Sequence, residues 1–296
     1  MAISVRPVTA ADVSAVGEII AVAFNDVFQR HGFPAPWPQL QAAEIVPSVY
    51  VSYPGVRGFV AQRDGRVVGS GFVLIRGDKA GIGPVAIAPE AQGSGAGRAI
   101  MERLLEEARD CSSVRLIQEA FNNVSFSLYS KLGFVSREVA PLLVAEDPRP
   151  KPAANSAAVR PMTPVDLEAV AALDARLTGM RRQPEYALLL GLGRQLVCER
   201  DGRLAGFLCR VSAGDSTLLG PAAAEGLDDL KGLLCEAAQL PGPRPIYLRL
   251  VASQHEVLRY VFDAGFVISN IGTYMVRGEW QPPQGAHLMA MFPEAI

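Results

Sequence analysis

The chain has 296 residues, enough for two domains of ordinary size that each bury a hydrophobic core. Apolar residues make up 49% of the chain and charged residues 20%, a balance that excludes an intrinsically disordered protein. The formal net charge of -2 provides no basic field to hold a polynucleotide, so we expect no nucleic-acid partner.

Cysteine usage and hydropathy indicate the cellular environment in which the protein folds. The four cysteines form no C-x-x-C pair and have no histidine at metal-ligand spacing, so we expect reduced thiols and no metal. No apolar signal core opens the chain, and no apolar run approaches the roughly 20 residues that a bilayer span needs. We therefore expect a soluble, cytoplasmic protein without a membrane partner.

The first predicted element is a short strand at residues 5–8 that runs into a helix. Thr9 is placed to cap this helix, and apolar residues then recur at helical spacing. The same opening returns at residues 159–163, and Asp166 follows it as Asp12 follows the first. A repeated strand and helix start indicates an internal duplication.

Two predicted hairpins support the duplication. The sequence Arg-Asp-Gly-Arg occurs at residues 63–66 and 200–203, each time between alternating apolar segments, and Asp-Gly is a preferred hairpin turn. These turns are 137 positions apart. The Gly-Pro pairs at 83–84 and 220–221, where we expect a strand to end, have the same offset.

Later landmarks set the domain boundaries. Gly-Phe-Val at 133–135 returns at 265–267 with an offset of 132, so the second copy has lost about five residues. Residues 148–157 are proline-rich and lack periodicity, as expected of a linker. We predict one domain over residues 1–147 and another over 158–296. Each is expected to be α/β (mixed α+β), with a mostly antiparallel mixed sheet flanked by helices.

A glycine-rich turn at residues 92–98 carries most of the chemistry. An apolar strand precedes it and an amphipathic helix follows it, while glycines at 93, 95 and 97 let a ligand approach the backbone closely. The free N–H groups and the dipole of the helix start favour an anion such as a pyrophosphate. The run matches neither the P-loop nor the G-x-G-x-x-G fingerprint. A tight turn without a ligand is the alternative interpretation.

Residues 92–97, Gln-Gly-Ser-Gly-Ala-Gly, resemble motif A of the GCN5-related N-acetyltransferase (GNAT) family, Q/R-x-x-G-x-G/A. Residues 122–134, NNVSFSLYSKLGF, resemble its motif B, N-x-x-A/S-x-x-L-Y-x-K-L-G-F. The resemblance covers the first copy and reaches the second only through the repeat. It implies a tandem GNAT protein with acetyl-CoA as co-substrate and no metal.

The resemblance also implies the site residues. In the family the loop amides hold the pyrophosphate, the preceding strand polarises the thioester carbonyl, and the motif B asparagine braces the pantetheine arm. The implied cofactor-binding residues are Val85, Ala86, Ile87, Gln92, Gly93, Ser94, Gly95, Ala96, Gly97, Arg98, Asn122 and Ser125. Tyr129 stands at the position of the acid that protonates the departing thiolate, with an ordinary half-buried helix tyrosine as the alternative.

The general base and the acceptor site are less defined. Residues 80–85 lack the glutamate that many family members carry there, so Glu119 on the next strand is the nearest candidate, unless it is a solvated strand-edge residue. The family's acceptor site is shaped by the first two helices and their connection. Here the connection at residues 29–38 is aromatic and proline-rich, and it either lines an apolar pocket or caps the core. His31 within it is more simply a surface histidine.

The second copy departs from the motifs. Its counterpart of the glycine loop carries Glu225, Asp228 and Asp229, which would meet a pyrophosphate with like charge, so we expect no coenzyme A there. Phe262 stands beside the tyrosine position, so the acid is missing as well. We expect this copy to be structural or to form part of the acceptor pocket, and the chain to end in a strand near residues 287–291.

The sequence thus predicts an N-acetyltransferase that moves an acetyl group from acetyl-CoA to a primary amine of a small molecule, by direct attack in a ternary complex. One alternative is an acyltransferase for a longer acyl-CoA, and another is a non-catalytic acyl-CoA-binding or regulatory module. The acceptor is left open among antibiotics, amino acids, polyamines and protein lysines. A monomer or a homodimer is compatible with the duplication.

Overall fold

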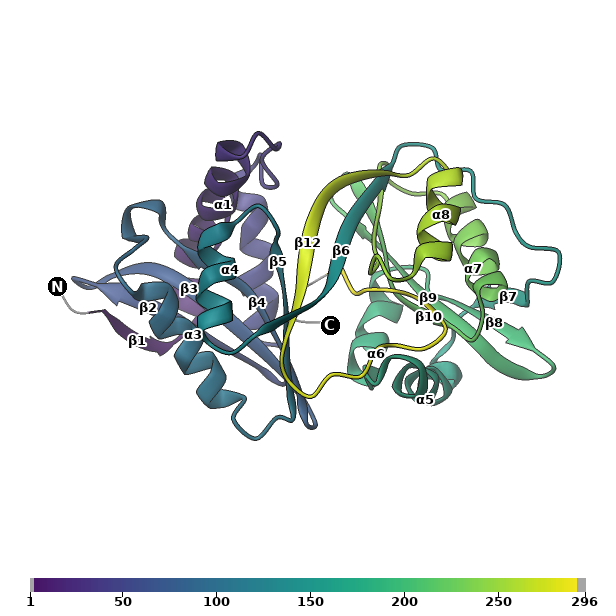
Figure 1. Ribbon diagram of the computed structural model, residues 1–296, viewed down its shortest axis with the longest axis horizontal. Helices are drawn as coiled ribbons and strands as arrows, with labels where there is room; N and C mark the ends of the chain where they lie inside the picture. The colour runs from purple at the N-terminus through teal and green to yellow at the C-terminus, as the bar shows by residue number, and fades with distance from the viewer. Residues whose placement is uncertain (1–2, 292–296) are drawn as a thin grey trace. The chain divides into compact units, whose positions relative to one another are not determined.

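The structure is a computed structural model, and it describes residues 3–291. The chain forms two compact units, and Figure 1 labels helices and strands of both. Unit 1 contains the chain up to Ser136 together with Met275–Glu279, and unit 2 contains Arg137–Tyr274 together with Trp280–Met291. Within the described range no helix has both the length and the apolar character that a membrane span requires.

Unit 1 is built on a mixed sheet in the order β1-β2-β3-β4-β5, in which only β4 and β5 are parallel. The end of a late strand, residues 275–278, completes this unit, and Met275 is buried in its core. Its elements are β1 (Ser4–Pro7), α1 (Val13–Arg30), α2 (Ile45–Tyr50), β2 (Val56–Arg63), β3 (Arg66–Arg76), β4 (Lys79–Ile87), α3 (Ala96–Glu107), β5 (Ser113–Glu119) and α4 (Asn123–Lys131).

Unit 2 repeats the plan with the order β6-β11-β10-β9-β8-β7, and β13 pairs with β10 as well. Strand β6 belongs to the first sequence copy, yet it pairs with β11 in this unit. The elements are β6 (Val135–Ala145), β7 (Ala158–Pro161), α5 (Leu167–Thr178), α6 (Gln183–Leu192), β8 (Leu196–Arg200), β9 (Arg203–Ala213), β10 (Ser216–Ala224), α7 (Leu227–Gln239), β11 (Ile246–Arg249), α8 (His255–Asp263), β12 (Val267–Gly278) and β13 (Ala286–Leu288). The predicted mixed, mostly antiparallel sheets are confirmed.

The repeated opening of the two copies is also a repeated set of contacts. Asp12 accepts hydrogen bonds from the backbone N–H and the hydroxyl of Thr9, both at 2.8 Å, and from the guanidinium of Arg6 at 2.7 Å. The hydrogen bonds from Arg6 hold the pKa of Asp12 well below its usual range. The second copy forms the same arrangement with Arg160, Thr163 and Asp166. Each of the two helix starts is therefore fixed by its own capping box with an added ion pair.

The hairpin predictions are confirmed, and the predicted strand ends at Gly-Pro are wrong. The Asp-Gly pair at 64–65 has φ angles of 53° and 77°, the left-handed values that a two-residue turn requires. Strand β4 does not stop at Gly83-Pro84 but continues to Ile87. Its register with β3 shifts between Gly71 and Val73, so a bulge accommodates a proline that cannot donate to the ladder.

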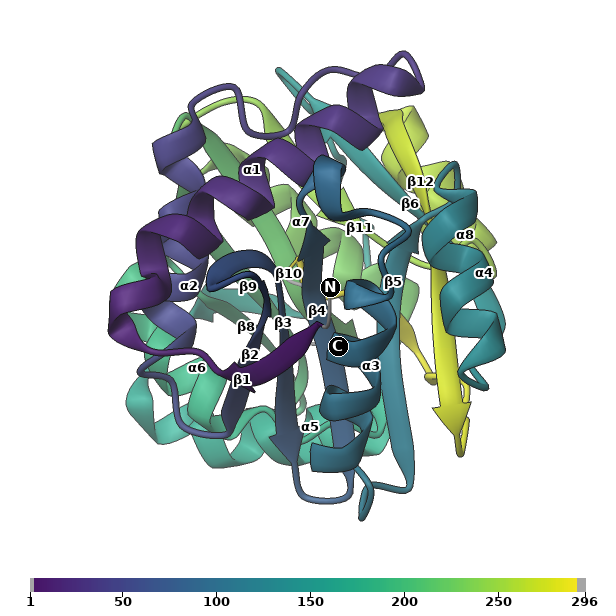
Figure 2. The ribbon, with the colours of Figure 1, turned by 90° about the vertical axis from the view of Figure 1, so that its left-hand side faces the viewer.

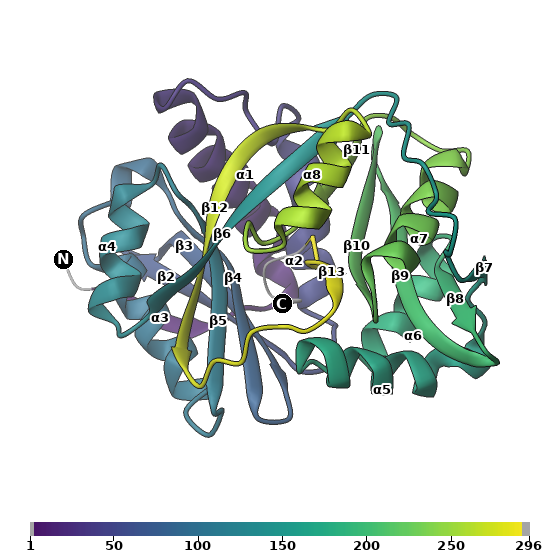
Figure 3. The ribbon, with the colours of Figure 1, turned by 45° about the vertical axis from the view of Figure 1, so that its right-hand side comes forward.

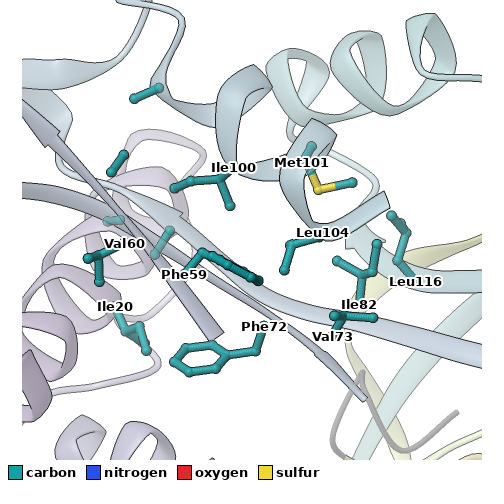
Figure 4. Close-up of a cluster of buried hydrophobic side chains, with 14 of the residues drawn as sticks. Ile20, Phe59, Val60, Phe72, Val73, Ile82, Ile100, Met101, Leu104 and Leu116 are labelled. Atoms are coloured by element: carbon teal, nitrogen blue, oxygen red, sulfur yellow. The ribbon is translucent and has the colours of Figure 1, made fainter. Parts of the chain in front are cut away.

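Helix α3 packs on the sheet of unit 1 through two glycines of β3 (Figure 2). A Cβ atom added at Gly69 or Gly71 would lie 2.5 Å from the side chain of Ile87 or Ile100, respectively. Figure 4 shows Ile100 and its helix neighbours on one side of the sheet, with Ile20 of α1 on the other. The close approach of α3 fixes the glycine-rich turn at the end of β4.

Candidate active site

Strands β4 and β5 separate partway along their length. They pair in parallel only from Lys79–Ser113 to Gly81–Arg115, whereas β4 stays paired with β3 as far as Ile87. Among the described residues no strand pairs with the β5-facing edge of β4 beyond Gly81. The edge that includes the predicted residues 85–87 can therefore bond an extended ligand through its backbone groups.

The glycine-rich turn follows this edge directly, after a short 3-10 turn over Pro89–Ala91 that the sequence did not predict. Gly93 and Gly95 have φ angles of 77° and 91°, and a Cβ at either would meet nothing within 4 Å. Gly95 is the N-cap of α3 and supplies no side-chain acceptor. Within the described chain the first-turn N–H groups, at residues 96–98, have no acceptor. The turn thus offers open space beside a set of backbone donors.

The side chains of the turn are engaged locally. The Ser94 hydroxyl donates to the carbonyl of Ala91 at 2.7 Å, and the Gln92 side-chain oxygen accepts from Arg30 of α1 at 3.4 Å. Arg98 is exposed and forms an ion pair one turn along α3. The backbone, rather than these side chains, is what the turn presents to a ligand.

We call the place where β4 and β5 separate the fork. Helix α4 follows β5, the second strand of this fork. Asn122 caps it, since the side-chain oxygen accepts from the N–H of Ser125 at 3.2 Å. The Ser125 hydroxyl donates to the side-chain oxygen of Gln118 on β5 at 3.0 Å. Both predicted cofactor residues therefore have a structural role in the free protein, which leaves the amide nitrogen of Asn122 as its donor to a ligand.

Gln118 is a candidate that sequence reasoning missed. It lies on the part of β5 that does not pair with β4 and is 5% exposed, and its Nε2 group has no acceptor among the described residues. Leaving a buried donor unpaired costs about 1–3 kcal/mol, so a bound ligand that accepts from it is expected. At the offset of 132, the second copy replaces Gln118 and Ser125 with Leu250 and Val257. That comparison between the copies could have identified the pair.

Tyr129 is part of the buried core of unit 1. It lies one helical turn after Ser125, is 8% exposed, and packs against Phe134 with ring centroids 6.1 Å apart. Burial raises the pKa of Tyr129 to about 12, so the phenol remains protonated at neutral pH. In the described part of the chain no group hydrogen-bonds its hydroxyl, which leaves the proton available to a ligand.

The acetyltransferase (GNAT) family model matches residues 13–134, the stretch that holds the fork, the turn and Tyr129. This part of the chain is a GNAT domain. A curated relative, the IAA acetyltransferase of Azospirillum brasilense, is 36% identical over 89 residues, which are 28% of this chain and 58% of that protein. The chain thus covers less than two thirds of that relative.

Solved structures extend the likeness to the whole chain. A putative acetyltransferase from Pyrococcus horikoshii matches with a TM-score of 0.76 at 20% identity, over 99% of this chain and 95% of that one. A tandem GNAT protein from the clavulanic acid biosynthesis pathway matches with a TM-score of 0.64 at 19% identity, over 95% and 100% of the two chains. The predicted fold of two tandem GNAT-like domains is confirmed.

Aromatic residues from two segments of unit 1 meet after β5. Glu119, the proposed base, is the partly buried last residue of this strand. Phe121 lies two residues later. Its ring stacks on the ring of Phe33, in the connection at residues 29–38, with ring centroids 4.6 Å apart. His31 is exposed, and its Nδ1 lies 2.7 Å from the carbonyl of Val27. Because a carbonyl only accepts, the Nδ1 atom of His31 is the donor in this contact.

The structure shows which residue of the second copy takes the place of Tyr129. Phe262 is 41% exposed, whereas Val261 is 1% exposed and occupies the buried position that corresponds to Tyr129. Phe262 therefore lies beside the tyrosine position and Val261 occupies it, because a helix face admits only one of two neighbours to the interior.

The acidic residues near the start of α7 are not unopposed charges. Glu225 forms ion pairs with Arg176 and Arg203, and Asp229 forms one with Arg200. Hydrogen bonds from Arg203 lower the pKa of Glu225, so the carboxylate stays charged but paired. Like-charge repulsion alone is thus a weaker obstacle to a pyrophosphate than the sequence indicated.

Proposed function

We propose that the protein is an N-acetyltransferase that transfers the acetyl group of acetyl-CoA to a primary amine of a small molecule. The observation that carries the proposal is the unpaired edge of β4, which leads directly into the free amides at the start of α3. An extended thioester arm ending in a pyrophosphate matches both parts. We assign catalysis to unit 1, which contains most of the domain predicted over residues 1–147, and a supporting role to unit 2.

In this proposal the ternary complex reacts in one displacement. The amine lone pair attacks the thioester carbonyl carbon, and a backbone N–H within residues 85–87 stabilises the oxyanion that develops. The C–S bond then breaks, and the electron pair leaves with sulfur. Tyr129 gives its proton to this thiolate, a role that its raised pKa favours because the phenol stays protonated. Glu119, directly or through water, takes the proton from the amine.

A binding measurement followed by a turnover measurement tests this function. Acetyl-CoA is expected to raise the melting temperature, and thiol release should follow when a panel of primary amines is added. Stabilisation without release on any amine would instead support a binding or regulatory module. Faster release from longer acyl-CoA donors would support the broader acyltransferase alternative.

Gln118→Leu tests the buried amide at the fork. The Leu250 counterpart shows that leucine suits this position in the second copy, so the free protein should melt at the same temperature or higher. The KM for acetyl-CoA should rise about 5- to 13-fold, as expected for one lost hydrogen bond of about 1–1.5 kcal/mol. Steady-state kinetics at saturating amine measure it. An unchanged KM would remove Gln118 from the site.

A further inference from the structure

Unit 2 contains the same fork as unit 1, and there the fork is filled. Strands β10 and β11 pair in parallel from Thr217–Ile246 to Leu219–Leu248. With the offsets of 137 and 132, the pair Leu218–Tyr247 corresponds to Gly81–Arg115 in unit 1. The parallel pairing continues to Leu219–Leu248 in unit 2, so the strands diverge one residue later there than in unit 1.

Strand β13 occupies the fork of unit 2, beside β10 in Figure 3. It pairs antiparallel with residues 222–224 of β10, in the register Ala223–His287. On its other side the N–H of Met289 donates to the carbonyl of Arg249, the last residue of β11, at 2.8 Å. Residues 222–224 are the counterparts of 85–87, the edge that unit 1 leaves unpaired.

A side-chain amide clamps the inserted segment. Gln254, the counterpart of Asn122, accepts from the backbone N–H of His287 at 3.1 Å and donates to the carbonyl of Gly285 at 3.0 Å. His287 is buried, and burial lowers its pKa to about 4, so the segment enters without a charge at neutral pH. The motif position proposed to brace an acyl-donor arm in unit 1 thus holds a peptide backbone in unit 2.

The fit of the segment is close at both ends. A Cβ added at Gly285 would lie 2.3 Å from the carbonyl oxygen of Ala224, and one added at Gly220 would lie 2.1 Å from that of Met289. Such distances are shorter than real Cβ contacts allow, so only glycine permits the approach from either side. The fork and the segment are shaped to each other.

We propose that unit 2 is a strand-binding module whose ligand is the chain's own segment 285–289. This segment stands in the place of an acyl-thioester arm and excludes one from unit 2. The recognised chemistry is an extended amide backbone with an uncharged side chain opposite Ala223. The proposal rests on the geometry of unit 2 and not on the reaction proposed for unit 1.

Cleavage of the folded chain tests the proposal. A protease site inserted between Pro282 and Pro283 would be cut, and an excess of labelled peptide covering residues 284–291 added. We expect the native segment to remain bound after cleavage and the labelled peptide then to exchange into its place. Fluorescence anisotropy of the labelled peptide measures this exchange. Immediate release without rebinding, while circular dichroism shows that the units remain folded, would overturn the proposal.

Peptide and chain variants sharpen the test. A peptide with Gly285→Val should bind at least about tenfold more weakly because of the contact with Ala224, whereas Gln284→Ala, at an exposed side chain, should bind normally. In the uncut chain, Gln254→Leu should speed hydrogen exchange of residues 286–288 about tenfold. Equal binding of the two peptides, or unchanged exchange, would show that the segment is not a specific ligand.

Discussion

Gly95→Asp is expected to weaken acetyl-CoA binding by about 100-fold or more while the free protein stays folded. A Cβ atom at this position meets nothing within 4 Å, and aspartate tolerates the φ of 91° better than most residues do. Its carboxylate is favourable beside the helix start, but it occupies the space proposed for the pyrophosphate. Two like charges about 4 Å apart repel by about 4 kcal/mol near a protein surface. Isothermal titration calorimetry with acetyl-CoA measures the loss.

Gly77→Asp provides the matched control for this substitution. Gly77 also has a positive φ, 57°, and open space around its Cβ, but it lies in the turn that precedes β4, at the opposite end of that strand from the glycine-rich turn. Backbone strain should therefore be similar, and acetyl-CoA affinity should stay unchanged. If both variants bind acetyl-CoA as the parent does, the amides at the start of α3 are not the pyrophosphate site.

Local features of this fold could be predicted because a few adjacent residues determine them. An Asp-Gly pair between alternating apolar segments fixes a hairpin, and a threonine three residues before an aspartate fixes a helix start. The glycine-rich turn is local in the same sense, since Gly93 and Gly95 adopt the positive φ angles that glycine favours. The internal repeat then extended the hairpin and helix-start predictions to the second unit.

Pairings over long range were beyond the sequence. Strands β6 and β12 hold equivalent places in the two copies, yet β6 pairs in unit 2 and the last residues of β12 complete unit 1. A strand pattern states which face is apolar but not which neighbour it joins. The strand near residues 287–291 was predicted, and it spans Ala286–Leu288, but its position in the fork depends on contacts about 65 residues away.

The buried polar residues of the site show the same limit. Gln118 stands between Ile117 and Glu119, and nothing in these neighbours indicates that its side chain is enclosed. Likewise, the charges of Glu225 and Asp229 are visible in the sequence, but the arginines that pair with them come from other elements. Charge can be counted along a chain, whereas its neutralisation depends on the fold.

Tyr129→Phe is expected to lower kcat by about 100-fold or more with little change in the KM for acetyl-CoA, because a general acid contributes about 10²–10⁴-fold in rate. The hydroxyl has no hydrogen bond within residues 3–291, so its removal should leave the melting temperature unchanged. Tyr260→Phe, at a partly buried tyrosine on α8 of unit 2, should leave kcat unaltered and serves as the control.

The pH dependence separates an acid from a packing residue. An acid works in its protonated form, and burial raises the pKa of Tyr129 to about 12, so its ionisation should not reduce the parent's kcat below about pH 11. An acetyl donor with a more acidic thiol needs less help from an acid, so the defect of Tyr129→Phe should shrink with that donor. A defect of equal size with both donors would mean that Tyr129 positions the thioester and that the sulfur is protonated by another group.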